Sequence, residues 1–232
     1  MNSPDFRTQL TERLKELHLP ALRRCFEEKA QERREHRVAR LLQESKLPLE
    51  KTLGNFDLQR LPPKAARHIG TLRDGTFLDR KENVLVFGNP GSGKTHLLSA
   101  LGQELIRSGR RVAFTTCVRL VQELLLAKKE LRLNRAIRKL AYYEALVIDD
   151  LGYVQQSREE MEVLFTVLAE RYERGSVLIS SNLAFSKWEG IFKDPMTTAA
   201  AIDRLVPHSV ILELNITSYR MEQAKKKKAE EE

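Results

Sequence analysis

The chain has 232 residues, 41% hydrophobic and 31% charged, which suits one folded α/β core with a small accessory domain and excludes a fibrous or disordered chain. Forty Lys and Arg against 32 Asp and Glu give a formal net charge of +8, which favours polyanionic partners such as nucleic acid. The sequence shows neither a signal peptide nor a bilayer-spanning apolar stretch, so we expect a cytoplasmic protein without a membrane partner.

The N-terminal part of the sequence predicts helices. A first-turn proline followed by leucines at helical spacing predicts a helix over residues 4–18. Residues 21–44 are very rich in charge and carry few apolar anchors, which predicts further helices with a narrow buried face. We therefore expect a small all-helical domain over residues 1–47.

Prolines mark a boundary after these helices. Pro48, and then Pro62 and Pro63, disfavour helix in the residues immediately before them. This pattern predicts an extended linker over residues 48–63, with Phe56 as a docking residue.

Apolar strands alternate with helical patterns in the next part of the chain. Short apolar runs predict strands at 84–87, 112–116, 145–148, 177–180 and 210–214. Between them, apolar periodicity predicts helices that include residues 120–140 and 159–174. Such alternation implies a mostly parallel sheet flanked by helices on both faces. We expect this α/β domain over residues 64–215, and a tail over residues 216–232 that is disordered at its end.

A complete phosphate-binding motif follows the first of these strands. The motif G-x4-G-K-S/T is formed by Gly88, Asn89, Pro90, Gly91, Ser92, Gly93, Lys94 and Thr95. Backbone N–H groups of such a loop close around phosphate oxygens, and the following helix adds the positive end of its dipole. Lys94 would reach the β- and γ-phosphates, and Thr95 would offer its hydroxyl to Mg²⁺. The motif therefore predicts a site for ATP and Mg²⁺.

Polar side chains end the two strands predicted at 145–148 and 177–180. Asp149 is the expected Mg²⁺ partner, because an acidic residue at the end of such a strand holds the ion directly or through water. Asp150 is positioned to polarise the attacking water as a general base, although many ATPases carry the longer Glu there. Asn182 follows the next strand, where the carboxyl edge of a parallel sheet would bring it beside the γ-phosphate as a sensor.

Further motifs follow in an order that is typical of one family. After the phosphate-binding loop come residues 147–153, 181–182, 201–205 and 218–220, with the sequences VIDDLGY, SN, AIDRL and SYR. Over residues 47–220 the chain resembles the IstB family of insertion-sequence transposition helpers, which is similar to the DnaC helicase loaders among the AAA+ ATPases. The resemblance implies a P-loop NTPase with an AAA+ core and no C-terminal lid.

The resemblance also implies partners and two arginine roles. It implies an ATP-hydrolysing homo-oligomer, with active sites between subunits, that binds duplex DNA without sequence preference and cooperates with the transposase of the same element. Arg204 lies where an arginine finger would enter the neighbouring subunit's site, and a local ion pair with Asp203 is the alternative. Arg220 is a candidate nucleotide-sensing arginine that would contribute to nucleotide binding.

Basic residues recur in the helix predicted over residues 120–140. The spacing i, i+4, i+7 and i+11 joins Lys128, Arg132, Arg135 and Lys139. On a continuous helix they would form one face that follows DNA phosphates, with steep salt dependence, while Leu133, Ile137 and Leu140 would pack inward. A solvated amphipathic helix is the alternative interpretation.

Other functions share parts of this pattern. A DnaC-like replicative helicase loader would carry the same nucleotide site and differ in what its N-terminal domain holds. An ATP-gated DNA clamp with little turnover is suggested by Asp150 in place of Glu. A small-molecule P-loop kinase is disfavoured, because no acceptor-substrate pocket is recognisable after Asn182.

Overall fold

The computed structural model describes residues 6–152, 157–192 and 194–219. The chain divides into two compact units between Arg40 and Leu41. The first unit consists of helix α1 (Phe6–Glu16) and the first part of helix α2 (Pro20–Ser45). Each of residues 8–40 keeps part of its surface exposed, in agreement with the highly charged sequence. The predicted N-terminal helices are confirmed, and no helix among the described residues is long and apolar enough to cross a bilayer.

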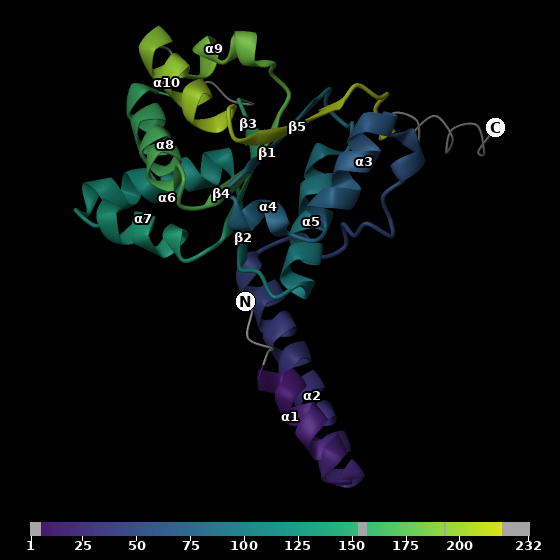
Figure 1. Cartoon of the computed structure of the whole chain (residues 1–232). Coiled ribbons are helices and arrows are strands. Elements are labelled where there is room, and N and C mark those ends of the chain that lie inside the picture. The colour runs from purple at the N-terminus through teal and green to yellow at the C-terminus, as the bar shows by residue number, and fades with distance from the viewer. Residues whose placement is uncertain (1–5, 153–156, 193, 220–232) are drawn as a thin grey trace, which may run out of the picture. The chain divides into compact units, whose positions relative to one another are not determined.

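The second unit is built on a five-stranded parallel sheet (Figure 1). The strands are β1 (Asn83–Gly88), β2 (Val112–Thr116), β3 (Ala145–Leu151), β4 (Ser176–Ser181) and β5 (Ser209–Leu214). Their order across the sheet is β2-β3-β4-β1-β5, and every neighbouring pair is parallel. The predicted parallel sheet is confirmed. Because all strands point the same way, the ends of β1, β3 and β4 meet at one edge.

Helices cover both faces of the sheet (Figure 1). They are α3 (Pro63–Leu72), α4 (Thr76–Asp79), α5 (Lys94–Arg107), α6 (Cys117–Lys129), α7 (Leu133–Ala141), α8 (Arg158–Arg171), α9 (Glu189–Phe192) and α10 (Pro195–Leu205), with 3-10 turns at Leu58–Arg60 and Phe185–Lys187. On the side of α6 and α8, the apolar faces of these helices pack on β3 and β4 around the fully buried Trp188. On the other side, α5 buries Leu97, Leu101 and Leu105.

The continuous helix predicted over residues 120–140 is wrong. The chain leaves α6 at Glu130 and turns through Leu131, whose φ is +57°. Leu131 N–H donates to the Lys128 carbonyl at 3.1 Å and Arg132 N–H to the Ala127 carbonyl at 2.7 Å, the hydrogen-bond pattern of a Schellman helix end. The four predicted DNA-binding cations are therefore divided between two helices and their turn, and do not form one helical face.

The predicted linker residues lie along α5. Gln103 Nε2 donates to the carbonyls of Pro48, at 3.2 Å, and Lys51, at 2.9 Å. His96 Nε2 lies 2.8 Å from the Thr52 carbonyl, and Leu47 packs directly over the helix glycine Gly102. Residues 47–52 are thus fixed to the helix that follows the phosphate-binding loop. The domain boundaries expected at residues 47, 63 and 215 stay predictions.

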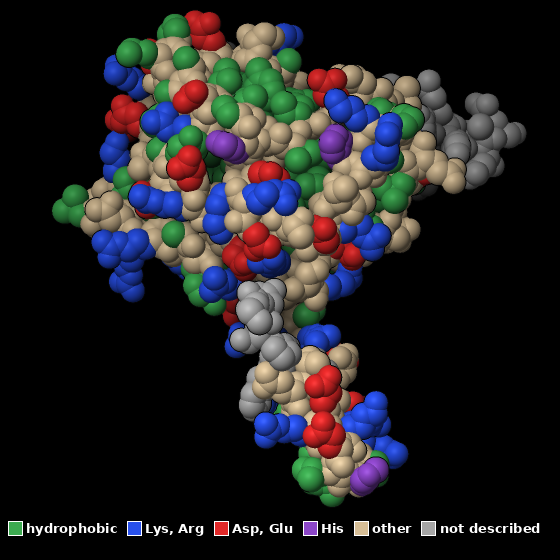
Figure 2. Space-filling model, viewed as in Figure 1, with side chains coloured by type: hydrophobic (Ala, Val, Ile, Leu, Met, Phe, Trp, Pro, Cys, Tyr) green, Lys and Arg blue, Asp and Glu red, His purple; other side chains and the backbone are tan. Residues whose placement is uncertain are grey.

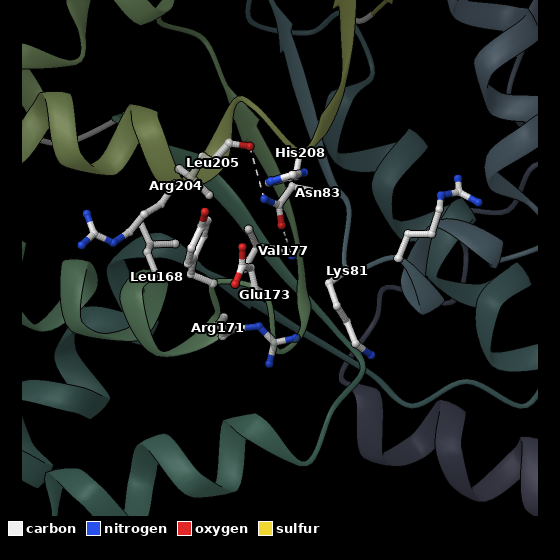
Figure 3. Close-up of a pocket in the computed structure, with 11 residues that line it drawn as sticks. Lys81, Asn83, Leu168, Arg171, Glu173, Val177, Arg204, Leu205 and His208 are labelled. Carbon is white, nitrogen blue, oxygen red and sulfur yellow. Dashed lines mark hydrogen bonds between the residues drawn. The ribbon is translucent and has the colours of Figure 1, made fainter.

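The buried Arg171 side chain contacts the ends of several elements. It lies near the starts of β1 and β4, at the opposite end of the sheet from the loop that follows β1. The Arg171 side chain is only 4% exposed, and it donates to the carbonyls of Leu140, Tyr143, Glu144 and Ser176 at 2.8–3.1 Å. Burial lowers the pKa of Arg171 to about 10, so the guanidinium stays protonated at neutral pH. Figure 3 shows it at the base of a pocket lined by residues of β1, β4, α8 and α10.

We expect Arg171→Met to lower the free energy of unfolding by about 3 kcal/mol, because buried carbonyls lose a charged hydrogen-bond donor. Urea unfolding monitored by circular dichroism measures this difference. Arg174→Met is the matched control, since Arg174 is exposed and pairs with the exposed Glu170, and its effect should stay below about 0.5 kcal/mol. Equal unfolding midpoints for the two variants would contradict the assigned role of Arg171.

Candidate functional site

The loop between β1 and α5 has a backbone conformation that requires its glycines. Gly91 and Gly93 have φ values of +81° and +92°, in the region that side chains rarely adopt. A Cβ atom on Gly91 would lie 2.1 Å from the Ser218 Oγ, and one on Gly88 would lie 2.6 Å from the Leu214 carbonyl oxygen. The loop is therefore closely covered by the segment that follows β5, and only glycine fits these positions.

Two polar groups of the loop are arranged as an anion site requires. Lys94 is 6% exposed, and its Nζ donates to the carbonyls of Gly88 at 2.8 Å and Asn89 at 3.1 Å. The Ser92 Oγ is buried and finds no hydrogen-bond partner among the described residues. Buried polar atoms without partners are rare in proteins, and a free hydroxyl that lines the same pocket as a buried ammonium suits a phosphate oxygen. The loop thus fits the phosphates of a nucleotide.

A pocket of about 400 Å³ lies over this loop. The predicted site residues on its wall are Pro90, Gly91, Ser92, Gly93, Lys94, Thr95, Asp150 and Asn182. The structure therefore brings together the loop, the end of β3 and the end of β4, as the order β3-β4-β1 requires. The volume falls within the range of small-molecule and cofactor sites.

A bulge at the end of β3 separates the two acidic residues. Ile148 pairs with Ile179 and Leu151 with Ser181, so β3 contains one extra residue here. Asp150 has a φ of +59° and faces the pocket, whereas Asp149 is 3% exposed. The two carboxylates therefore have different environments, one buried next to the sheet and one open to the pocket.

Ser180 on β4 holds this acidic pair, and sequence reasoning did not assign it a role. Its Oγ donates to Asp149 Oδ1 at 2.5 Å and accepts from the Asp150 N–H at 2.8 Å. Its side chain is fully buried. One hydroxyl thus orients the Asp149 carboxylate and fixes the bulge that exposes Asp150. The only signal in the sequence was its place at the end of a predicted strand, two residues before Asn182.

Ser180→Ala should lower the free energy of unfolding by about 1–2 kcal/mol, since both hydrogen bonds are buried and one involves a carboxylate. It should also weaken Mg²⁺-dependent ATP binding, because Asp149 loses the group that orients it. Chemical unfolding and nucleotide titration with and without Mg²⁺ test the two effects. The exposed Ser186, replaced by alanine, is the control. If Ser180→Ala matches that control in both measurements, this role of Ser180 is wrong.

Two distant segments form the other walls of the pocket. Phe56 lies against Gly93 and packs edge to face on the His96 ring, with centroids 5.2 Å apart, so the prediction that it docks is confirmed. Arg60 Nη2 donates to the Thr217 carbonyl at 3.2 Å, and the Arg60 guanidinium lies 5.3 Å from the Tyr219 ring centroid. No local sequence pattern indicates the Arg60 contacts, because they join residues more than 150 positions apart.

Arg204 lies at the opposite edge of the sheet from this pocket. It lines a second pocket of about 180 Å³ together with Asn83 and Val177, near the starts of β1 and β4. Figure 3 shows its guanidinium pointing away from Asn83. Arg204 Nη1 donates to the Ala200 carbonyl at 2.8 Å, and its guanidinium lies 5.0 Å from the Phe165 ring centroid. Among the described residues it forms no ion pair with Asp203.

The remaining predicted residues lie outside the nucleotide pocket. Lys128 pairs with Glu162 at 3.3 Å, and Arg132 pairs with Glu130 at 2.7 Å. Arg135 and Lys139 are exposed on α7, while Leu133, Ile137 and Leu140 pack on the core as predicted. Arg220 lies outside the described residues.

The parallel sheet, the glycine loop between β1 and α5, and the acidic pair at the end of β3 together define a P-loop nucleotide-binding protein of the AAA+ class. The model of the IstB-like ATP binding protein family matches residues 6–228. The chain therefore belongs to that family, as its motif order indicated.

Relatives named as ATP-binding proteins of insertion sequences are similar to this chain. One from Sinorhizobium fredii is 43% identical over 194 residues, which cover 83% of this chain and 65% of that protein. That of insertion sequence IS21 from Pseudomonas aeruginosa is 38% identical over 185 residues, covering 80% of this chain and 70% of that protein. The chain thus spans less than two thirds of the length of the S. fredii relative.

Solved structures share the fold at low sequence identity. The DnaC helicase loader matches with a TM-score of 0.57 and 18% identity, over 66% of this chain and 88% of that chain. AMPPCP-bound DnaA from Aquifex aeolicus matches with a TM-score of 0.58 and 20% identity, over 81% and 56% of the two chains. At these identities the likeness establishes the fold alone.

Proposed function

We propose that this chain binds ATP with Mg²⁺, hydrolyses it, and uses the cycle to assemble on duplex DNA beside a transposase in the cytoplasm. The observation that carries the proposal is the convergence of Lys94, Asp150 and Asn182 on one pocket over a closed P-loop. The names of the relatives, ATP-binding proteins of insertion sequences, support the transposition context.

The proposed roles follow from the positions of the side chains. Lys94 would release the loop carbonyls and bind the β- and γ-phosphates, with Ser92 Oγ donating to a phosphate oxygen. Asp150 would accept a proton from the attacking water. Asn182, directly after the neighbouring strand β4, would orient that water or the γ-phosphate.

Residues suited to Mg²⁺ lie at the same edge of the sheet. Thr95 lies in the first turn of α5, and the Asp149 carboxylate is held by Ser180. Hard oxygen donors such as a hydroxyl and a carboxylate suit Mg²⁺, which also binds substrate phosphates. When bound, the ion would neutralise charge on the phosphates as the terminal phosphoryl group is transferred.

A homo-oligomer and DNA binding are part of the proposal. Arg204 is at the amino edge of the sheet, so it would act on the nucleotide of a neighbouring subunit rather than on its own. The net charge of +8 supports binding to a polyanion. Phosphate contacts of this kind confer little sequence preference.

Steady-state release of phosphate from ATP and Mg²⁺, with and without random-sequence duplex DNA, tests the catalytic part. Wild type should turn over ATP, and Asp150→Asn should lower turnover by about 100-fold or more while ATP still binds. Equal turnover by the two proteins would remove Asp150 from the reaction. ATP binding without turnover in wild type would instead favour the ATP-gated clamp, which the short Asp150 side chain suggests.

A further inference from the structure

The turn between α6 and α7 carries a leucine at a position where this residue type does not stabilise the fold. Leu131 has a φ of +57°, at a helix-ending position where glycine is the favoured residue. Its side chain is 95% exposed, so it contributes almost no buried apolar surface. Leucine here is unfavourable for the backbone and gains nothing from packing. A role in contact with another molecule accounts for both features.

The backbone of the turn is fixed by hydrogen bonds and by the packing of the two helices. Backbone hydrogen bonds from Leu131 to Lys128 and from Arg132 to Ala127 close the turn at 3.1 and 2.7 Å. On either side, α6 and α7 are anchored in the core by the buried Leu124 and Ile137. The apolar side chain is therefore presented at a fixed position, which suits insertion into a partner.

The surroundings of the leucine are strongly basic. Four nearby cations are exposed and, in the part of the chain that the structure describes, have no hydrogen-bond or ion-pair partner: Lys129, Arg135, Arg138 and Lys139. Figure 2 shows a hydrophobic tip at the left end of the view, where α6 and α7 meet in Figure 1, with Lys and Arg side chains beside it. The surface thus combines one projecting apolar group with unpaired positive charge.

We propose that Leu131 is an apolar wedge that this chain inserts between base pairs of duplex DNA, while the four cations bind flanking phosphates. The inference rests on the DNA binding proposed above and specifies its mode. A duplex offers stacked bases for the leucine and phosphates for the cations, and leucine wedges of this kind unstack and bend DNA. An interface with another protein would present a wider apolar core with fewer charges.

The test measures binding and unstacking together, with the full chain, ATP and a duplex that carries the fluorescent base 2-aminopurine. Wild type should bind and raise the fluorescence, because the base loses its stacking. Leu131→Gly should raise the unfolding temperature, since glycine suits the backbone, and yet abolish the fluorescence increase. Its affinity should fall by no more than about tenfold, because the phosphate contacts remain.

Two further variants serve as controls. Arg135→Gln should weaken binding and reduce the salt slope by about one, with the fluorescence at saturation unchanged. Met196→Ala removes another exposed apolar side chain, 83% exposed on α10, and should behave as wild type.

Each contrary outcome has a distinct meaning. If wild type binds DNA and Leu131→Gly gives the same fluorescence increase, the wedge is wrong and the proposed DNA binding stands. No binding by wild type would overturn the proposed DNA function, and the wedge with it. A loss of self-association in Leu131→Gly with unchanged fluorescence would assign the leucine to a contact between copies of the chain.

Discussion

Arg204→Ala is expected to lower ATP turnover by about 1,000-fold or more, while ATP affinity stays within about threefold of wild type. Arg204 and the P-loop lie at opposite ends of β1, so the guanidinium would meet the γ-phosphate of a neighbouring subunit. There its charge would stabilise the transition state and contribute little to ground-state binding. Phosphate-release assays and titration with a fluorescent nucleotide separate the two quantities.

Two controls distinguish action between subunits from a structural role of Arg204. Arg80 lines the same pocket and pairs with Glu82 at 2.8 Å, so Arg80→Ala should leave turnover nearly unchanged. Mixing Arg204→Ala with Asp150→Asn subunits should restore part of the activity, because some interfaces then combine an intact arginine with an intact carboxylate. A mixture that stays inactive would contradict an arginine acting in trans.

Lys94→Ala is expected to weaken ATP binding by about 100-fold or more, because a buried ammonium that would form charged hydrogen bonds to phosphates is lost. Isothermal titration with ATP measures the change. Lys187→Ala, which removes an exposed lysine from the 3-10 turn after β4, is the control and should bind ATP as wild type does. ATP affinity unchanged by loss of Lys94 would refute this assignment of the phosphate site.

Local patterns predicted the parts of the molecule that depend on neighbouring residues. Continuous apolar runs indicated the buried strands, and the glycines of the loop before Lys94 indicated the P-loop. Both were confirmed. The placement of Asn182 followed from topology, because parallel strands bring their ends to one edge.

Other features depend on long-range or side-chain geometry and were not predictable. The break at Leu131 was missed because no glycine or proline marks it. The link from Ser180 to Asp149 crosses between strands 31 positions apart. The contact between Arg60 and Tyr219, which forms one wall of the nucleotide pocket, joins the segment before β1 to the segment after β5. Such contacts arise from tertiary packing and have no local signature.

The central claim is that ATP in the P-loop pocket controls binding to DNA. Equilibrium binding of wild type to random-sequence duplex, measured with ATP, with ADP and without nucleotide, tests it most directly. We predict tight binding with ATP only, steep weakening with salt, and loss of the ATP effect in Lys94→Ala. Equal affinity in all three nucleotide conditions would contradict the account.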